Sequence, residues 1–263
     1  MVISEQALIR PELQLIEVKE NLMKSRTRTW MTVVCLSAAL AMPARSIAQN
    51  KPDNKPTFTT FDVPGGIDTF PRGINPSGMI TGYYCNDYCQ SFLRDSDGTI
   101  TTFQVPGASA TMAQSINPAG AITGYYYVVE GSSGFLRASD GTLTTFDVPG
   151  VGVTDTDVSG INPAGTIAGY YADASGVFHG YLRARDGTFT TFDVADASML
   201  GGPGTLASAI NSEGKITGYY ADANGNYHGF LRGRSGIITT FDPPESTFTI
   251  PLAINPAGEI TGY

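Results

Sequence analysis

The chain has 263 residues, a formal net charge of −8 and a charged fraction of 15%, below the roughly 25% of an average globular domain. Thirty-one glycines indicate a chain with many turns. Only ten basic residues follow residue 48 and they are scattered, which excludes a basic surface for nucleic acid or for an anionic membrane.

The N-terminal 48 residues have the features of an export signal. Lys24, Arg26 and Arg28 precede an apolar run at 30–42, and small residues stand at Ser46 and Ala48, so residues 23–48 are predicted to be a secretory signal peptide cleaved after Ala48. The apolar run is too short to span a bilayer comfortably, so the processed chain is not predicted to span a membrane. We expect a secreted, extracellular or periplasmic protein. Residues 1–22 are interpreted as a leader from a mis-assigned start codon, with a genuine amphipathic leader as the alternative, and 49–56 as a linker.

Residues 57–263 contain five repeats, which start near 57, 99, 142, 188 and 237. The phrase Ile-Asn-Pro-(Ala/Ser)-Gly, or Ile-Asn-Ser-Glu-Gly in the fourth repeat, recurs at spacings of 42, 45, 49 and 44 residues. Thr-Thr-Phe recurs five times and (Phe/Tyr)-Leu-Arg four times. Such periods are typical of solenoids and propellers.

Each repeat predicts four short strands in chain order. The first is a Thr-Thr-Phe strand, as at 57–63, followed by Pro-Gly or a related turn. The second ends in Ile-Asn, before a type I turn. The third is Ile-Thr-Gly-Tyr-Tyr, whose glycine leaves room for a close neighbour. The fourth is His-Gly-Phe-Leu-Arg or a relative, often followed by an Asp-Gly hairpin.

Four strands in about 45 residues predict an all-β chain that forms a β-propeller of five blades with about four antiparallel strands each. A parallel β-helix is the weaker alternative, because its coils are shorter. The chain stops inside the third strand of the fifth repeat, so we expect nineteen strands, an incomplete last blade, and a sequence that is a truncated reading of a longer protein.

The repeat also resembles a known family. Residues 207–219 read Ala-x-x-Ile-Asn-x-x-Gly-x-Ile-x-Gly-Tyr, and His-Gly-Phe-Leu follows at 228–231. This string is similar to the HAF repeat of extracellular bacterial proteins, over all of 57–263. Glycine replaces the central alanine of the name-giving triplet, and Arg follows Leu where Trp is frequent. The resemblance implies a secreted β-propeller-like repeat protein, and it assigns no activity to any residue.

The candidate ligand-binding residues are aromatic rings and two histidines. One tyrosine of each Tyr-Tyr pair is expected to pack between blades, while the other is free to stack on a sugar. His179 and His228, the only histidines, occupy equivalent positions in two repeats. They invite a metal-site or general-base interpretation, but equivalent positions in different blades should lie far apart. The predicted ligand contacts are Tyr84, Tyr126, Tyr171, Tyr220, His179 and His228.

Other polar groups suggest further sites, each with a simpler structural explanation. Asp173, Asp222, Asn224 and Asn226 alternate like calcium ligands, yet the same residue types suit a hairpin tip. Calcium is therefore the only cofactor considered. Asp155 and Asp157 alternate on one strand and form a possible hydrolase carboxylate pair or simply a polar face. Cys85 and Cys89 are expected to form a disulfide in an exported chain.

No catalytic residue is assigned, because the sequence has no nucleophile elbow, P-loop, zinc helix motif or dinucleotide fingerprint. The preferred interpretation is a non-enzymatic binding module for an extracellular glycan, peptide or protein surface. The alternative is an extracellular hydrolase or lyase with its site at the mouth of the propeller channel. The insertion at 196–205 is expected on one rim.

Overall fold

The structure is a computed structural model that describes residues 56–263 except 130, 151 and 199–202. The predicted signal peptide, leader and linker up to residue 55, and part of the insertion at 196–205, lie outside the described residues. The compact unit is Phe58–Tyr263. Its described residues form strands, turns and loops without a helix, which confirms the predicted all-β class. No helix among them is long and apolar enough to cross a bilayer.

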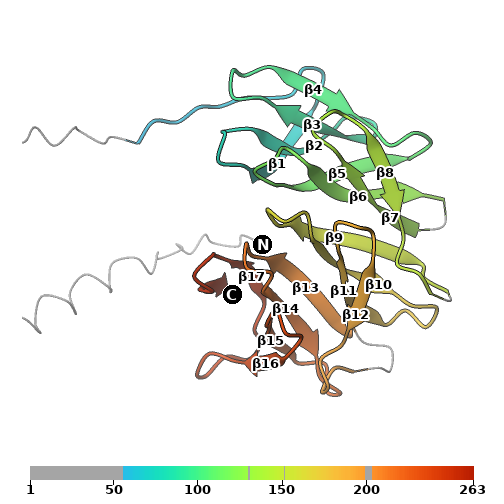
Figure 1. Ribbon diagram of the computed structural model, residues 1–263, viewed down its shortest axis with the longest axis vertical. Helices are drawn as coiled ribbons and strands as arrows, with labels where there is room; N and C mark the ends of the chain where they lie inside the picture. Colours follow the sequence, from blue (N-terminus) through green and yellow to red (C-terminus); the bar gives the residue numbers. More distant parts are fainter. Residues whose placement is uncertain (1–55, 130, 151, 199–202) are drawn as a thin grey trace, which may run out of the picture. The chain divides into compact units, whose positions relative to one another are not determined.

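The strands follow one another as antiparallel units in chain order (Figure 1). Sheet 1 contains β1 (Asp68–Ile74), β2 (Ile80–Cys85), β3 (Cys89–Arg94) and β4 (Ile100–Phe103). Sheet 2 contains β5 (Ala110–Ile116), β6 (Ile122–Val128), β7 (Gly131–Arg137) and β8 (Leu143–Phe146). Sheet 3 contains β9 (Asp155–Ile161), β10 (Ile167–Ala172), β11 (Phe178–Arg183) and β12 (Phe189–Phe192). Sheet 4 contains β13 (Thr205–Ile210), β14 (Ile216–Ala221), β15 (Tyr227–Arg232) and β16 (Ile238–Phe241).

The fifth unit, which we call the last hairpin, contains β17 (Pro251–Ile254) and β18 (Ile260–Gly262). One parallel bridge between Ser132 of β7 and Asp155 of β9 joins sheets 2 and 3. The inner strands of successive units are also in contact, and the backbone N–H of Thr249, just before β17, donates to the Tyr227 carbonyl of β15 at 2.8 Å.

The Thr-Thr-Phe phrase corrects the predicted order of strands. It forms the last strand of a sheet, β4, β8, β12 and β16, and pairs with the preceding (Phe/Tyr)-Leu-Arg strand. Residues 57–63 were predicted to be a strand but form none, and the given sequence has no (Phe/Tyr)-Leu-Arg phrase before them, which is the partner of Thr-Thr-Phe in the four sheets. The described residues therefore contain eighteen strands instead of nineteen.

The two aromatic phrases recur because they pack on each other across the junction between sheets. The phenylalanine of Thr-Thr-Phe contacts the ring of the next sheet's third strand edge-on. The pairs are Phe61–Phe92, Phe103–Phe135 and Phe192–Phe230, with centroids 5.9, 6.0 and 6.1 Å apart. The arginine of that third strand covers the same phenylalanine, within the range of a cation–π contact. These contacts are Arg94 on Phe61, Arg137 on Phe103, Arg183 on Phe146 and Arg232 on Phe192, at 4.8 to 5.1 Å.

The asparagine of Ile-Asn-Pro links neighbouring repeats by hydrogen bonds. In the type I turn of sheet 2, Asn117 accepts the backbone N–H groups of Ala119 and Ala121, both at 3.0 Å. Its amide donates to the backbone carbonyl of Asn162 in the next repeat at 3.5 Å. The amides of Asn75 and Asn211 likewise donate to the backbone carbonyl of the equivalent asparagine in the following repeat. Because these asparagines are buried, their recurrence in every repeat has a structural cause.

Candidate functional site

A β-bulge interrupts the first strand of every unit at the same place. It lies three residues before the asparagine of the Ile-Asn phrase, at Arg72, Gln114, Ser159, Ser208 and Leu252. The bulge presses a backbone carbonyl against the glycine of the neighbouring Gly-Tyr strand. A Cβ on Gly124 would lie 2.1 Å from the Met112 oxygen, and the other four units repeat this contact at 2.0 to 2.2 Å. The sequence predicted that this glycine leaves room for a close neighbour, and that neighbour is the backbone carbonyl at the bulge.

The five bulged residues meet in one cavity. Arg72, Gln114, Ser159, Ser208 and Leu252 all line a hollow with a volume of about 440 Å³. Bulges frequently re-aim a side chain next to a functional site. Three features hold the units together in nearly every repeat, and we call them the frame: the glycine that faces the bulge, the asparagine of the Ile-Asn phrase, and the phenylalanine–arginine contact between sheets. The bulged position, in contrast, carries a cation, an amide, two hydroxyls and an alkyl group. This cavity is therefore the place where the repeat loses its symmetry, and we take it as the candidate site.

Tyrosines supply the aromatic part of the cavity wall. They are the first members of the Tyr-Tyr pairs, namely Tyr125, Tyr170 and Tyr219. Burial raises the pKa of Tyr125 and of Tyr170 well above the usual 10, so both remain phenols that donate and accept hydrogen bonds at neutral pH. At the side of sheet 1, the Arg72 guanidinium donates to the Tyr83 hydroxyl at 2.6 Å.

Asp157 is the carboxyl group in the cavity wall. Burial raises its pKa above the usual 3.8, and nearby Asp155 acts in the same direction. The Ser132 hydroxyl donates to Asp157 at 3.0 Å and lies 3.3 Å from Asp155. The two aspartates thus share one face of β9, as the alternation predicted, but only Asp157 lines the cavity.

These groups suit hydrogen bonding better than acid–base chemistry with two carboxyl groups. A glycosidase mechanism uses two carboxyl groups that flank the scissile bond, and the described lining contains one. What the cavity offers is a guanidinium, a carboxyl, an amide, hydroxyls and aromatic rings around one hollow. Such a set can orient a small polar ligand by several hydrogen bonds while tyrosine rings cover its apolar faces.

The tyrosines predicted as ligand contacts lie elsewhere. Tyr84, Tyr171 and Tyr220 belong to or pack against the core clusters of sheets 1, 3 and 4, and Tyr126 packs against that of sheet 2. The second tyrosine of each pair therefore covers the core, while three first tyrosines line the cavity. Ligand binding by these four tyrosines stays a prediction.

Each histidine lies between two aspartates of its own sheet and stacks on one of these tyrosines. His179 is 2.9 Å from Asp193 and 3.4 Å from Asp173, and its ring centroid is 5.0 Å from that of Tyr171. His228 repeats this with Asp242, Asp222 and Tyr220, at 2.7, 3.5 and 5.2 Å. Hydrogen bonding to Asp242 raises the pKa of His228 above its usual 6.5. The structure thus pairs each histidine with a tyrosine and places neither in the cavity lining.

The calcium candidates Asp173, Asp222, Asn224 and Asn226 form hairpin tips. One carboxylate oxygen of Asp222 accepts the backbone N–H groups of Asn224 and Asn226, both at 2.8 Å, and the other faces their side-chain amides. Asp173 accepts two backbone N–H groups in the same way. Within 56–263, apart from the undescribed positions, no three His, Cys, Asp or Glu side chains are grouped to hold a metal. At the equivalent tip of sheet 1, a disulfide joins Cys85 and Cys89.

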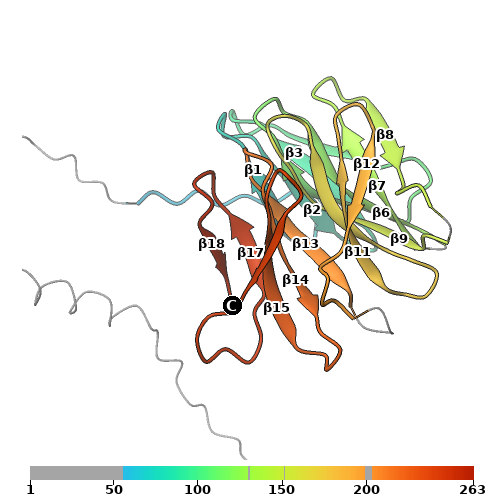
Figure 2. The same ribbon diagram turned by 60° about the horizontal axis from the view of Figure 1, so that its bottom comes forward.

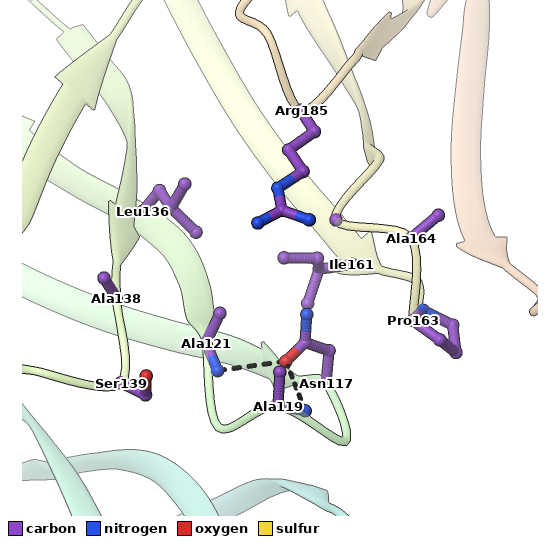
Figure 3. Close-up of a pocket in the computed structure, with 11 residues that line it drawn as sticks. Asn117, Ala119, Ala121, Leu136, Ala138, Ser139, Ile161, Pro163, Ala164 and Arg185 are labelled. Atoms are coloured by element: carbon purple, nitrogen blue, oxygen red, sulfur yellow. Dashed lines mark hydrogen bonds between the residues drawn. The ribbon is translucent and has the colours of Figure 1, made fainter.

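A second type of hollow lies between the rims of neighbouring sheets. Figure 3 shows the one between sheets 2 and 3, of about 260 Å³, into which Arg185 extends from the β11–β12 turn. Its Asn117 is already engaged by the turn, as the dashed lines show, and alanines form much of the wall. A similar hollow with Arg234 lies between sheets 3 and 4. Because it recurs with the repeat, it follows from the packing of the frame.

Comparisons with known proteins identify the fold. TolB from Acinetobacter baumannii matches with 18% identity over 69% of this chain and a TM-score of 0.50. A catalytically inactive virginiamycin B lyase from Staphylococcus aureus matches with 16% identity over 76% of this chain and 71% of its own, at a TM-score of 0.45. A triple arginine-to-alanine mutant of AofleA from Arthrobotrys oligospora matches with 14% identity over 72% of this chain and 62% of its own, at a TM-score of 0.44. The chain spans 44% of the length of TolB.

At such identities the likeness concerns the fold alone, and the match to TolB carries it: the chain has a β-propeller fold. No family model and no curated protein sequence matches the chain.

The sequence prediction of ligand contacts included none of the five bulged residues and none of the cavity tyrosines Tyr125, Tyr170 and Tyr219. Aligning the five Ile-Asn phrases shows that the third position before asparagine varies, but the fourth and fifth positions before it vary too, so the alignment alone does not single out the bulged residue. The residues that repeat in every unit hold the sheets together and do not mark the cavity.

Proposed function

We propose that the chain is a non-enzymatic binding module that holds a saccharide in the cavity lined by the five bulged residues. The observation that carries this proposal is the contrast between a constant frame and a variable residue aimed from each unit into one hollow. A frame that needs no variation for packing leaves the variable position free for ligand recognition.

The chemistry of the wall favours a saccharide. Sugar hydroxyls both donate and accept, and the wall presents Arg72 and Gln114 as donors and Asp157, Ser159 and Ser208 as acceptors. Tyr125, Tyr170 and Tyr219 supply rings for the C–H faces of a sugar. The volume of about 440 Å³ lies in the range of small-molecule sites.

A glycan array with and without calcium, followed by calorimetry on the best ligand, tests this proposal. Replacing Asp157 by Asn or Arg72 by Ala should weaken binding at least about tenfold, as expected when a buried polar partner is lost. Arg185→Ala is the control, because Arg185 lines only the rim hollow. Absence of saccharide binding, or equal affinity in all four proteins, would contradict the proposal.

The second candidate is an extracellular hydrolase or lyase that acts at the same cavity. The direction of the Asp157 pKa favours it, because burial shifts this carboxyl towards the protonated form that a general acid uses. Incubating the array ligand with the protein and analysing the products by mass spectrometry separates the candidates. Cleavage that Asp157→Asn abolishes would establish the enzyme, and an intact ligand would leave the binding module.

Three further features belong to this proposal. We propose a propeller of five blades, supported by the fact that each of the five units contributes one bulged residue to a single cavity.

Membership of the HAF repeat family rests on the phrases at 207–219 and 228–231. Export rests on residues 23–48, and the intact mass of the exported chain tests it, since cleavage after Ala48 leaves a product that begins at Gln49 and contains no tryptophan.

A further inference from the structure

Arg72 is the charged member of the five bulged residues, and it lies in the cavity wall without a carboxylate partner. Its guanidinium donates to the Tyr83 hydroxyl at 2.6 Å. Within the described part of the chain, no Asp or Glu side chain forms an ion pair with it. A guanidinium carries five N–H donors, so one neutral hydroxyl leaves most of them without a partner in the described protein. Arg72 is also exposed, so a ligand in the hollow can reach it.

Tyr83 holds this guanidinium in a defined position. The tyrosine is buried and its ring stacks on that of Phe70, with centroids 4.9 Å apart. The central carbon of the guanidinium lies 5.1 Å from the Tyr83 centroid. The other four units carry a neutral side chain at the bulge, so the frame does not require a cation there. The cation at the cavity is therefore specific to sheet 1.

Asp157, the carboxyl in the same wall, does not neutralise Arg72. The two residues come from β1 and β9, which Figure 2 shows in separate sheets. Asp157 accepts a hydrogen bond from the Ser132 hydroxyl at 3.0 Å and another from the Tyr170 phenol. Burial and the neighbouring charge of Asp155 raise its pKa, and no described arginine lowers it. A cationic ligand group would thus meet a carboxyl that already has two donors, whereas an anionic group would meet a guanidinium with donors to spare.

We propose that the cavity binds an acidic saccharide and that Arg72 holds its anionic group, the carboxylate of a uronic acid or a sulfate ester. The inference rests on the proposed function, because it names the class of ligand for the same cavity. The guanidinium fork can pair with two oxygens of such a group at once. The neutral hydroxyls of the sugar are then left for Gln114, Ser159 and Ser208 in the other units.

A glycan array on the full chain tests this inference when each acidic saccharide is printed beside a neutral counterpart. Uronic acid oligosaccharides are paired with their carboxyl-reduced forms, and sulfated ones with their desulfated forms, so the two arms identify the anion. Calorimetry then measures the best pair. We expect the acidic member to bind at least about tenfold more tightly, because charge-assisted hydrogen bonds are lost in the neutral one. Added salt should weaken the acidic member more than the neutral one.

Variants show whether Arg72 causes the preference. Arg72→Gln should lower the affinity for the acidic member at least about tenfold and change that for the neutral member far less. Arg72→Lys keeps the charge but loses the fork, so its preference should be intermediate. Asp157→Asn should weaken both members alike. Arg185→Gln is the matched control, because Arg185 lines only the rim hollow, and it should leave the preference unchanged. Circular dichroism of each variant confirms that it is folded.

The possible outcomes separate this inference from the proposed function. Neutral saccharides that bind as tightly as their acidic counterparts, or a preference for amino sugars, would overturn the acidic ligand while the binding module stands. An acidic preference that survives in folded Arg72→Gln would overturn the role of Arg72. If no saccharide binds at all, the proposed function fails and this inference fails with it.

Discussion

The contact between the bulge and its facing glycine predicts a large effect of one methyl group. In Gly124→Ala the new Cβ would lie 2.1 Å from the Met112 carbonyl oxygen and 2.8 Å from the Ala113 Cα. Carbon–oxygen contacts begin at about 3.3 Å, so β5 must retreat by roughly 1 Å. Both partners are backbone atoms, so no side-chain rotation relieves the overlap. Weakening two neighbouring ladder hydrogen bonds and the adjoining packing should cost about 3 kcal/mol.

Thermal and urea unfolding followed by circular dichroism measure this cost. For a domain of this size, we expect the melting temperature to fall by roughly 6–12 °C. Gly176→Ala is the matched control. Gly176 has a φ of +76° and nothing within 4 Å of an added Cβ, so it bears only the cost of a left-handed backbone, about 1 kcal/mol. Equal destabilisation by the two substitutions would refute the idea that the bulge dictates this glycine.

Three other substitutions test separate parts of the structure. Asn117→Ala removes two accepted bonds and one donated bond at a buried turn and should cost about 3 kcal/mol in urea unfolding, against less than about 0.5 kcal/mol for exposed Asn224→Ala. Because the folded pKa of Asp157 is raised, stability should fall as the pH rises above 3.8 through that pKa. Asp157→Asn should flatten this part of the melting temperature–pH curve, and an unchanged slope would contradict the assignment. In NMR titrations His228 should titrate above 6.5, and Asp242→Asn should lower that pKa; an unaltered value would exclude Asp242 as its cause.

The strands and turns of the fold were readable because each repeated phrase has a local cause. Asn-Pro-Ala-Gly closes a turn in which Gly120 donates to the Asn117 carbonyl and has a φ of +82°. The assignment of strands to sheets was less accessible, because Pro-Gly and Asp-Gly are both turn signals. The structure places the Asp-Gly turns within sheets, where they keep neighbouring strands paired, and the Pro-Gly turns between sheets.

The site was less predictable than the frame for a physical reason. Period-two alternation places the two tyrosines of each pair on opposite faces but does not say which face meets the core. The bulge at Gln114 adds one residue to β5 and so changes which side chains point inward. Nothing in a local pattern of polarity marks that extra residue. Asp157 was noticed as half of a carboxylate pair, but its role as a single group in a shared wall depends on contacts between distant repeats.

The bulged position also has consequences for how this kind of protein can change over evolutionary time. A substitution at Gln114 or Ser208 alters the cavity wall while the glycine contact, the asparagine bonds and the ring–arginine packing remain in place. Duplication of one repeat supplies another copy of the frame together with one more independently mutable wall residue. New ligand specificities can therefore arise by single substitutions that leave folding almost unaffected. A library randomised at the five bulged positions should retain a high proportion of folded members.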